Sequence, residues 1–377
     1  MSSKFRNTHL LHLLDSFEKQ PLPLDVFLRI YFKKNTAIGS HDRKYLSETL
    51  YGLIRWLGLV DHFCQTPSPS WEERVQQLQT LQPEFHLQDT SIPLHHRVSF
   101  PQDYWDLLVE SLGEEQAKLF CLESNYPAPT TIRVNELKTS RKELLLQWQG
   151  TFPCKEGLFS PSALHFPHRV NFFGLPQFKE GLFEVQDEAS QLVAYQVAAK
   201  PGDQVLDYCA GSGGKSLAFA PKMQGKGQIY LHDIRSQALL EAKKRLKRAG
   251  IQNAQLLESG SPKKKHLIGK MDWVLVDAPC SGSGTLRRNP DMKWKFHRPG
   301  LQDILSLQRS IMEEALLYVK PKGKIVYATC SILPLENDLQ IQHFLQTLPL
   351  QQLSPPFRSF PTRGGMDGFY AATLQKL

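Results

Sequence analysis

The chain has 377 residues, enough for two or three domains, and its 41% of apolar residues is ordinary for proteins that bury a core. Its formal charge of +8 suggests a polyanionic partner. Its six scattered cysteines form no Cys-x-x-Cys pair, which argues against a zinc site and a disulfide framework. The start of the chain shows no leader pattern, and no segment is long enough to span a bilayer. We therefore expect a cytoplasmic monomer with reduced thiols, no metal and no membrane contact.

Residues 1–124 are predicted to form a helical domain. Apolar side chains recur at helical spacing over residues 46–57, behind a candidate N-cap at Ser40. Ser70 and Ser99 are each followed three residues later by Glu or Gln, the spacing of a capping box. The basic residues of this part form either an RNA-facing surface or a solvated face, and they are Arg29, Lys33, Lys34, Arg43, Lys44 and Arg55.

Residues 125–183 differ in composition, because prolines interrupt short β-rich segments such as residues 130–134. Proline confines strands to edges and short segments, so this part is predicted to be a small α+β linker domain. Arg133 and Asn135 either contact RNA or serve ordinary turn and surface roles.

Residues 184–377 alternate strands with helices, which predicts a doubly wound α/β sheet. A helix is expected whose caps lie near Gln186 and Asp187. Further on, residues 204–207 read as a strand that runs into a glycine loop, residues 208–216, and then a helix. This is the geometry in which backbone approaches a nucleotide closely.

The spacing of the glycine loop excludes two of its three usual ligands. A phosphate-binding P-loop ending at Ser216 needs a glycine where Cys209 stands, and a dinucleotide fingerprint starting at Gly211 needs a glycine at Ser216 itself. S-adenosylmethionine remains, since it has no pyrophosphate to hold. A second strand over residues 228–231 ends before Asp233, where a carboxylate is expected to accept ribose hydroxyls.

The helix predicted over residues 236–249 turns Leu239, Ala242 and Leu246 toward the sheet. Its basic residues are expected around the other side, for RNA contact or solvation. A lysine cluster at residues 263–265 is expected in a later loop, with the same two alternatives. The basic residues of the helix are Lys243, Lys244, Arg245, Lys247 and Arg248.

Asp277 and Cys280 stand just past a short buried strand, residues 273–276, and precede a small-residue loop. Ligands bind at the carboxyl ends of strands in open α/β sheets. Cys330 follows the strand at residues 323–328, so Cys280 and Cys330 are expected to converge. Between them, cations interleave with aromatic rings in a pattern that suits single-stranded nucleic acid, and these residues are Arg287, Arg288, Lys293, Trp294, Lys295, Phe296 and Arg298.

Together these motifs resemble the Nop–Sun family of RNA cytosine-C5 methyltransferases. The resemblance is carried by residues 207–215, 277–280, 329–331 and 367–371, and by the Gln-Asp-Glu-Ala-Ser segment at 186–190. It covers the chain from about residue 125 to the end and implies a Rossmann-like class I methyltransferase domain. The helical front part is similar, more loosely, to the NusB-like RNA-binding domain of bacterial members that modify small-subunit ribosomal RNA.

The resemblance also implies roles for individual residues. Cys330 is the implied nucleophile, Cys280 assists product release, Asp277 lies between cofactor and base, and Lys215 helps to orient the base. The implied contacts of S-adenosylmethionine are Cys209, Ala210, Gly211, Ser212, Gly213, Gly214, Lys215, Asp233 and Asp277. The chain departs from the family pattern in two places. Ser212 replaces the usual proline, and the acidic residue on the adenine side is missing near residues 258–260, where Glu258 is a candidate substitute.

The expected reaction is methylation of carbon 5 of a cytosine in RNA, most plausibly small-subunit ribosomal RNA. Two alternatives stay open: a transfer RNA methyltransferase, and a non-catalytic RNA-binding assembly factor that keeps the fold. The rival assignment of the thiols makes Cys280 the nucleophile, as in DNA cytosine methyltransferases, which attack with the cysteine of a Pro-Cys motif.

Overall fold

The computed structural model describes residues 3–167 and 170–377, which divide into two compact units. The first unit is Met1–Pro127 with Thr285–Gly300, and the second is Ala128–Gly284 with Leu301–Leu377. Sequence order alone does not predict this division, because residues 285–300 interrupt the second unit and belong to the first. No helix in the described ranges is long and apolar enough to cross a membrane.

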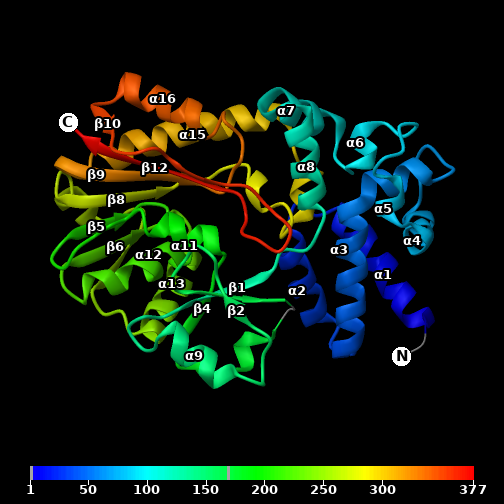
Figure 1. Cartoon of the computed structure of the whole chain (residues 1–377), viewed down its shortest axis with the longest axis horizontal. Helices are drawn as coiled ribbons and strands as arrows, with labels where there is room; N and C mark the ends of the chain where they lie inside the picture. The colour runs from blue at the N-terminus through cyan, green and yellow to red at the C-terminus, as the bar shows by residue number, and fades with distance from the viewer. Residues whose placement is uncertain (1–2, 168–169) are drawn as a thin grey trace. The chain divides into compact units, whose positions relative to one another are not determined.

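The first unit is helical, as predicted (Figure 1). Its core is built from leucines at helical spacing, with Leu13, Leu46, Leu50 and Leu53 fully buried. Burying one apolar stripe of each helix is what stabilises such elements, since isolated helices of this length are marginal in water. The helices are α1 (Ser3–Glu18), α2 (Leu24–Lys34), α3 (Ser40–Phe63), α4 (Trp71–Thr80), α5 (Pro83–His86), α6 (Leu94–Arg97), α7 (Gln102–Leu112), α8 (Glu114–Ser124) and the 3₁₀ turn η4 (Pro290–Lys293).

The two predicted capping boxes have different outcomes. Ser70 caps α4 by accepting the N–H of Glu73 at 3.1 Å, although the Glu73 carboxylate turns to neighbouring residues instead of completing the box. The prediction for Ser99 is wrong: it has a φ of 54°, and its hydroxyl accepts the N–H of Gly58 at 2.9 Å. The helix after it starts at Gln102, behind a proline, with no side-chain cap.

The segment at residues 285–300 does not offer the predicted stacking surface for nucleic acid. Lys293 is 1% exposed and donates to Asn125 Oδ1 at 2.6 Å. Phe296 stacks on Tyr104 with ring centroids 4.0 Å apart, and Trp294 packs against the helical core. Burial holds the pKa of Lys293 well below its usual range. The prediction of a stacking surface is therefore wrong for Lys293, Trp294 and Phe296, which pack internally, whereas Lys295 and Arg298 are exposed.

The basic residues of the helical unit differ in their exposure and in their contacts. Arg55 lies over the ring of Tyr51 and donates to the carbonyl of Arg287 at 3.1 Å, and burial lowers its pKa to about 10. Arg43 donates to the carbonyl of Ile38 at 2.8 Å. The others are exposed, namely Arg29, Lys33, Lys34 and Lys44.

The second unit begins with a small antiparallel sheet of order β2-β3-β1-β4. Its strand β1 spans Thr130–Val134, as predicted, and its core includes Ile132, Trp148 and Phe183. The elements are β1, α9 (Arg141–Trp148), β2 (Lys155–Glu156), β3 (Ala163–Phe166), η1 (Phe172–Gly174), α10 (Pro176–Lys179) and β4 (Phe183–Val185).

The predicted doubly wound α/β sheet is confirmed. Its strand order is β10-β12-β9-β8-β5-β6-β7, with β11 paired to β12. The pairs among β5 to β9 are parallel, and those of β12 are antiparallel. The elements are α11 (Glu188–Ala194), β5 (Gln204–Asp207), α12 (Gly214–Phe219), η2 (Ala220–Met223), β6 (Gln228–His232), α13 (Ser236–Ala249), β7 (Ala254–Leu257), α14 (Lys263–His266), β8 (Met271–Asp277), η3 (Ser283–Thr285), α15 (Arg298–Leu316), β9 (Val319–Thr329), α16 (Asp338–Thr347), β10 (Leu350–Gln352), β11 (Phe357–Ser359) and β12 (Phe369–Lys376).

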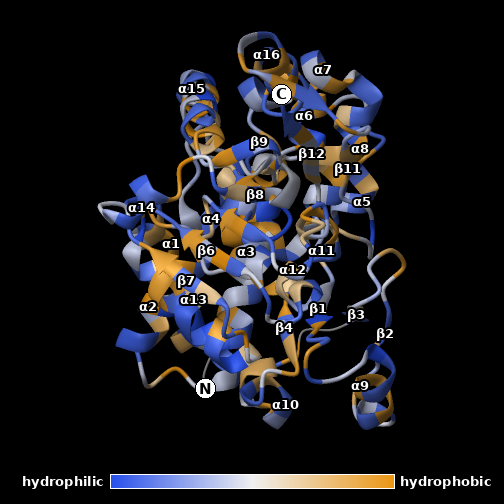
Figure 2. Ribbon diagram, turned by 90° about the vertical axis from the view of Figure 1, so that its left-hand side faces the viewer, coloured by the Kyte–Doolittle hydropathy of each residue, from blue (hydrophilic) through white to orange (hydrophobic). Residues whose placement is uncertain are grey.

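Helices cover both faces of this sheet, so its strands are apolar on both sides. Val205 and Leu275 pack with α11, α12 and α13, while Leu206 and Val274 pack with α15 and α16 (Figure 1). Strands β6, β7 and β8 are accordingly hydrophobic in Figure 2, whereas α15 alternates between hydrophobic and hydrophilic residues. This arrangement brings the ends of β5, β6, β8 and β9 to one edge of the sheet.

Candidate active site

The glycine loop joins β5 to α12 at the carboxyl edge of the sheet. Gly213 has a φ of 78°, and a Cβ there would lie 3.2 Å from Leu231 and 3.3 Å from Ala242. A side chain at Gly213 would therefore be strained and crowded. Gly211 also has a positive φ of 53°, but a Cβ on it would meet only the guanidinium of Arg235, at 3.7 Å. The loop is thus tightly packed at Gly213, whereas at Gly211 it has room for a side-chain atom.

Hydrogen bonds from α13 hold Ser212 in place. This serine stands where the family usually has proline. The Nη1 atom of Arg245 donates to the Ser212 carbonyl at 3.0 Å and to its hydroxyl at 2.6 Å. Glu184 in turn forms ion pairs with Arg245 and Arg248. The prediction that these two arginines lie on the outer side of the helix is wrong, because both are only partly exposed and ion-paired. Lys243, Lys244 and Lys247 are exposed.

Asp233 follows β6 and faces the glycine loop, as predicted. Its Oδ2 accepts the N–H of Gly211 at 2.8 Å, and its two oxygens also accept from Arg235. Burial opposes ionisation of Asp233, but the bonds from Arg235 and Gly211 outweigh it and lower the pKa. The carboxylate therefore stays ionised beside the loop.

Asp207 ends β5 beneath the same loop and is 1% exposed. Its Oδ2 accepts the hydroxyl of Ser216 at 2.7 Å, while its Oδ1 is buried without a partner among the residues that the structure describes. Burial raises the pKa of Asp207 to about 7, and the negative charges of Asp277 and Asp233 contribute. Burial also raises the pKa of Cys209, with contributions from the same three carboxylates. Three carboxylates, those of Asp207, Asp233 and Asp277, therefore lie close to this loop.

Lys215 and Asp277 form an ion pair between the first turn of α12 and the end of β8. Nζ of Lys215 lies 2.5 Å from Oδ2 of Asp277 and 5.4 Å from the ring centroid of Phe369. Burial by itself would lower the pKa of Lys215, but Asp277, and to a lesser extent Cys330 and Asp207, raise it above its usual value. Lys215 therefore remains a cation although it is only 9% exposed.

Cys280 and Cys330 converge, which confirms the expectation drawn from their strands. Their Sγ atoms lie 3.3 Å apart, although fifty residues separate them in the chain, and both are free, partly exposed thiols. The hydrogen bond with Cys330 raises the pKa of Cys280 well above its usual value, as do burial and the charge of Glu336. Cys330 also interacts electrostatically with the ammonium of Lys215.

The loops that carry the thiols are fixed by close backbone packing. The N–H of Gly284 donates to the carbonyl of Cys330 at 2.9 Å, and the N–H of Gly368 donates to the carbonyl of Gly284 at 2.8 Å. A Cβ on Gly368 would lie 2.7 Å from Cα of Gly284 and 2.6 Å from Ile332. Segments 279–284, 329–337 and 367–369 thus form one floor beneath the thiols.

Two residues of this floor, Glu336 and Asn337, were not predicted from the sequence. Asn337 accepts the hydroxyl of Thr329 at 2.6 Å and donates to the carbonyl of Ser331 at 2.9 Å, on either side of Cys330. Glu336 binds Ser281 and Ser331, next to the two cysteines. The only signal for them in the sequence is a run of three polar residues, 336–338, shortly after the cysteine strand.

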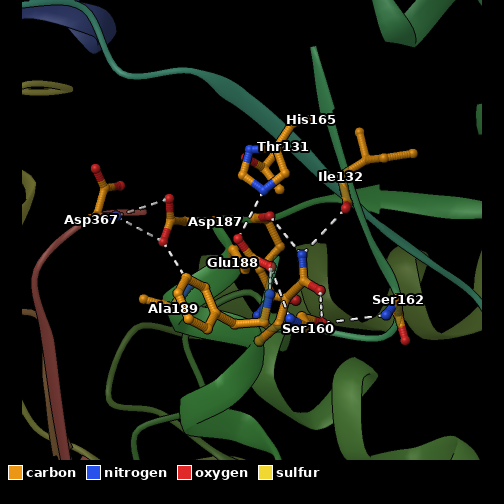
Figure 3. Close-up of polar contacts among 12 residues, drawn as sticks. Thr131, Ile132, Ser160, Ser162, His165, Asp187, Glu188, Ala189 and Asp367 are labelled. Carbon is orange, nitrogen blue, oxygen red and sulfur yellow. Dashed lines mark hydrogen bonds and ion pairs between the residues drawn. The ribbon is translucent and has the colours of Figure 1, made fainter. Parts of the chain in front are cut away.

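The segment at 186–190, which carried part of the resemblance, joins the two sheets of the second unit at the start of α11 (Figure 3). Asp187 is the N-cap, as predicted, and it also accepts the N–H of Asp367 at 3.2 Å. Glu188 accepts from His165 Nε2 at 2.8 Å and from the N–H of Ser160 at 2.8 Å. The bonds of this segment therefore hold the C-terminal segment and the small sheet beside the cofactor loop.

Arg133 and Asn135 have neither the predicted RNA contact nor a surface role. Arg133 is 3% exposed and donates to the carbonyl of Gly214 at 2.9 Å, and it also binds Gln186. Asn135 is 6% exposed and donates to the carbonyl of Ala249 at 2.9 Å. The predicted RNA-facing or surface position is wrong, because these polar groups bridge the small sheet to the large one. The turn role is confirmed for Asn135, whose Oδ1 accepts the N–H of Leu137 at 3.2 Å. Glu258, the candidate adenine-side residue, is exposed just after β7.

Comparisons with known proteins agree with this geometry. The family described as 16S rRNA methyltransferase RsmB/F matches residues 194–375. A probable ribosomal RNA small subunit methyltransferase B of Synechocystis sp. is 32% identical over 312 residues, covering 77% of this chain and 70% of the relative. The ribosomal RNA small subunit methyltransferase B of Proteus mirabilis is 34% identical, covering 67% and 60%. The chain thus spans 60–70% of the length of these two relatives.

Solved structures show the same fold. The crystal structure of PH0851 has a TM-score of 0.81 with 25% identity and covers 97% of each chain. A methyltransferase homologue from Pyrococcus horikoshii has a TM-score of 0.67 with 27% identity, covering 75% of this chain and 97% of that one.

Proposed function

Because the chain belongs to the 16S rRNA methyltransferase RsmB/F family, whose methyl donor is S-adenosylmethionine, we propose that it methylates carbon 5 of a cytosine in small-subunit ribosomal RNA. The proposal adds two things to family membership: the atom that is methylated, and a covalent route through Cys330. The observation that carries both is the contact of two thiols beside the Lys215–Asp277 pair.

The residues at the carboxyl edge of the sheet fit the cofactor. A Cβ at Gly211 would meet only Arg235, at 3.7 Å, and Asp207 has a buried oxygen without a partner among the described residues, which suits an ammonium donor. We assign the ribose hydroxyls to Asp233, which faces the loop at Gly211. S-adenosylmethionine carries an ammonium and a sulfonium, so nearby carboxylates favour it over anionic nucleotides. When bound, it supplies an electrophilic methyl group.

The target carbon needs activation before it can attack that methyl group. Carbon 5 of cytosine is a poor nucleophile, but a thiolate that adds to carbon 6 converts the ring into an enamine with a nucleophilic carbon 5. We assign this attack to Cys330, because it matches the family's nucleophilic cysteine and interacts with the ammonium of Lys215, whereas the contact with Cys330, burial and the charge of Glu336 raise the pKa of Cys280. The electrostatic surroundings of the two sulfurs therefore separate their roles.

Asp277 binds the cytosine ring, and Lys215 orients Asp277 and balances negative charge in the site. Asp277 ends β8 beside the glycine loop, where its carboxylate accepts a hydrogen bond from the exocyclic amine or from protonated N3. Lys215 fixes the orientation of that carboxylate and balances negative charge at Cys330. After methyl transfer a base removes the proton on carbon 5, the carbon–sulfur bond breaks, and Cys330 leaves as a thiolate assisted by Cys280.

Because the base must leave its stack to reach this pocket, we expect an unpaired or locally opened site in the RNA. Exposed lysines of α13 are available for phosphate contacts, so binding should weaken steeply with salt.

Transfer of tritium from labelled S-adenosylmethionine to small-subunit RNA of cells lacking the gene, followed by bisulfite sequencing, tests the reaction. Trapping on RNA that contains 5-fluorocytidine tests the route. Cys330→Ala should form no adduct, and Cys280→Ala should accumulate one. An adduct on Cys280 would reverse the assignment. Tight RNA binding with no transfer by the wild-type protein would instead favour a non-catalytic assembly factor.

A further inference from the structure

Glu336 is a fully buried carboxylate that reaches both cysteine loops. It lies between β9 and α16 and is 0% exposed. Its oxygens accept from the N–H and hydroxyl of Ser281 at 2.7 and 2.5 Å, next to Cys280. They also accept from the hydroxyl of Ser331, next to Cys330, and from Nε2 of Gln308 at 3.1 Å. One side chain thus fixes the residues that follow both thiols.

The charge of Glu336 matters as well as its hydrogen bonds. The two N–H groups that point at it can only donate, so this arrangement requires an acceptor on the side chain. Its hydrogen-bond donors are all neutral groups, namely the N–H and hydroxyl of Ser281, the hydroxyl of Ser331 and the side-chain amide of Gln308. A buried negative charge acts more strongly on its neighbours than an exposed one, because the local dielectric is low.

The two sulfurs differ in one electrostatic neighbour. Cys330, Glu336 and Tyr327 are among the titratable groups that act on Cys280. Cys330 interacts in addition with the ammonium of Lys215. The 3.3 Å contact between the sulfurs permits either thiol to be the donor, so the surrounding charges decide where the proton sits.

We propose that Glu336 is a positioning residue that holds the two cysteine loops together and keeps the proton of the thiol pair on Cys280. Cys280 then donates its S–H to the sulfur of Cys330. This hydrogen bond stabilises the Cys330 thiolate before it attacks carbon 6 and again when it leaves, without transferring a proton. The proton of carbon 5 therefore goes to solvent water, which can reach the two partly exposed thiols. The role in turnover rests on the proposed function, but the position of the proton does not.

Alkylation of Cys280 tests the position of the proton without RNA or cofactor. In the Cys330→Ala background, the rate of modification of Cys280 by iodoacetamide is followed against pH by peptide mass mapping. Adding Glu336→Gln, which keeps the size of the side chain and removes its charge, should speed modification at pH 7.5 by about tenfold and move the pH midpoint down by about one unit. The matched control is Glu313→Gln on the exposed face of α15, which should change neither.

Two further variants separate charge from packing. Glu336→Asp keeps the charge but shortens the reach, so Cys280 should retain its pH midpoint while turnover falls. Ser331→Ala removes one donor and should behave in the same way. Binding of S-adenosylmethionine reports that each variant is folded. An unchanged pH midpoint in folded Glu336→Gln would overturn the proposal, and so would a lowered midpoint in Glu336→Asp. Absence of RNA methylation by the wild type would affect only the proposed function.

Discussion

Lys215 and Asp277 meet across two neighbouring parallel strands, with Nζ of the lysine 2.5 Å from Oδ2 of the aspartate. Asp277 ends β8, and Lys215 lies in the first turn of the helix that follows β5. This ion pair connects the glycine loop to the loop of Cys280. It therefore links the proposed site of S-adenosylmethionine to the proposed site of the cytosine.

Replacing Lys215 by methionine should abolish most of the activity while the protein still folds. The change removes the partner of Asp277 and the cation that acts on Cys330, so we expect adduct formation with 5-fluorocytidine RNA to slow by at least about 100-fold. Single-turnover transfer of labelled methyl measures this loss. Lys226→Met, at an exposed turn before β6, is the control and should retain wild-type rates. Comparable rates in Lys215→Met would exclude a role for the ammonium.

Asp207 should make the stability of the second unit depend on pH. Its pKa is about 7 in the folded chain against 3.8 as the ordinary value, so the native state binds more protons between these values. The free energy of unfolding should therefore fall as the pH rises from about 4 to 7, with the full cost present above that. Asp207→Asn removes the titrating group. Relative to wild type, its melting temperature should rise by roughly 5 °C more at pH 8 than at pH 5.

Calorimetry at several pH values measures this difference. Asp303→Asn, on the exposed side of α15, serves as the control and should follow the wild-type curve. Parallel curves for Asp207→Asn and wild type would mean that Asp207 stays ionised in the folded chain.

Arg245 should act on cofactor affinity through Ser212. Arg245→Met removes both hydrogen bonds to the turn and leaves Glu184 with one arginine fewer, so the glycine loop loses its support from α13. We expect the dissociation constant of S-adenosylmethionine to rise by about tenfold, which corresponds to about 1.4 kcal/mol. Titration calorimetry gives the value. Lys244→Met, one residue earlier and exposed, should bind normally; equal affinities in the two variants would contradict the proposed support.

Gly368→Ala should destabilise the floor beneath the thiols. The added methyl group would lie 2.7 Å from Cα of Gly284 and 2.6 Å from Ile332, closer than real Cβ contacts allow. Overpacking of this kind costs about 1–3 kcal/mol, so a lowered melting temperature and loss of adduct formation are expected. Gly260→Ala, where a Cβ would meet nothing within 4 Å, is the matched control. A normal melting temperature for Gly368→Ala would show that these loops move apart readily.

The sequence predicted the large sheet well because its signals are local. Strands at Gln204–Asp207 and Thr130–Val134, and the helix at Ser236–Ala249, have the predicted bounds. Apolar periodicity and caps depend on residues a few positions apart, and the order of strands brings Cys280 and Cys330 to one edge of the sheet. For the same reason, position at strand ends singles out the two cysteines, Asp233 and Asp277 as site candidates, whereas Lys215 is a candidate only through the family resemblance.

The partners of the polar residues could not be predicted in the same way. Arg133, Arg245 and Lys293 read as surface cations, yet each is wholly or largely buried against groups far away in the chain. Glu336 gave no clear signal, although it holds both thiol loops.

The sequence by itself determined the fold class, the family and the residues available for chemistry. Only the tertiary structure decided which cations are buried, which carboxylate faces which thiol, and that residues 285–300 join the helical unit. The physical reason is that the periodicity of apolar residues indicates which face of an element is buried. A charged side chain instead binds whichever donor or acceptor folding brings within about 3 Å. That partner can stand anywhere along the chain.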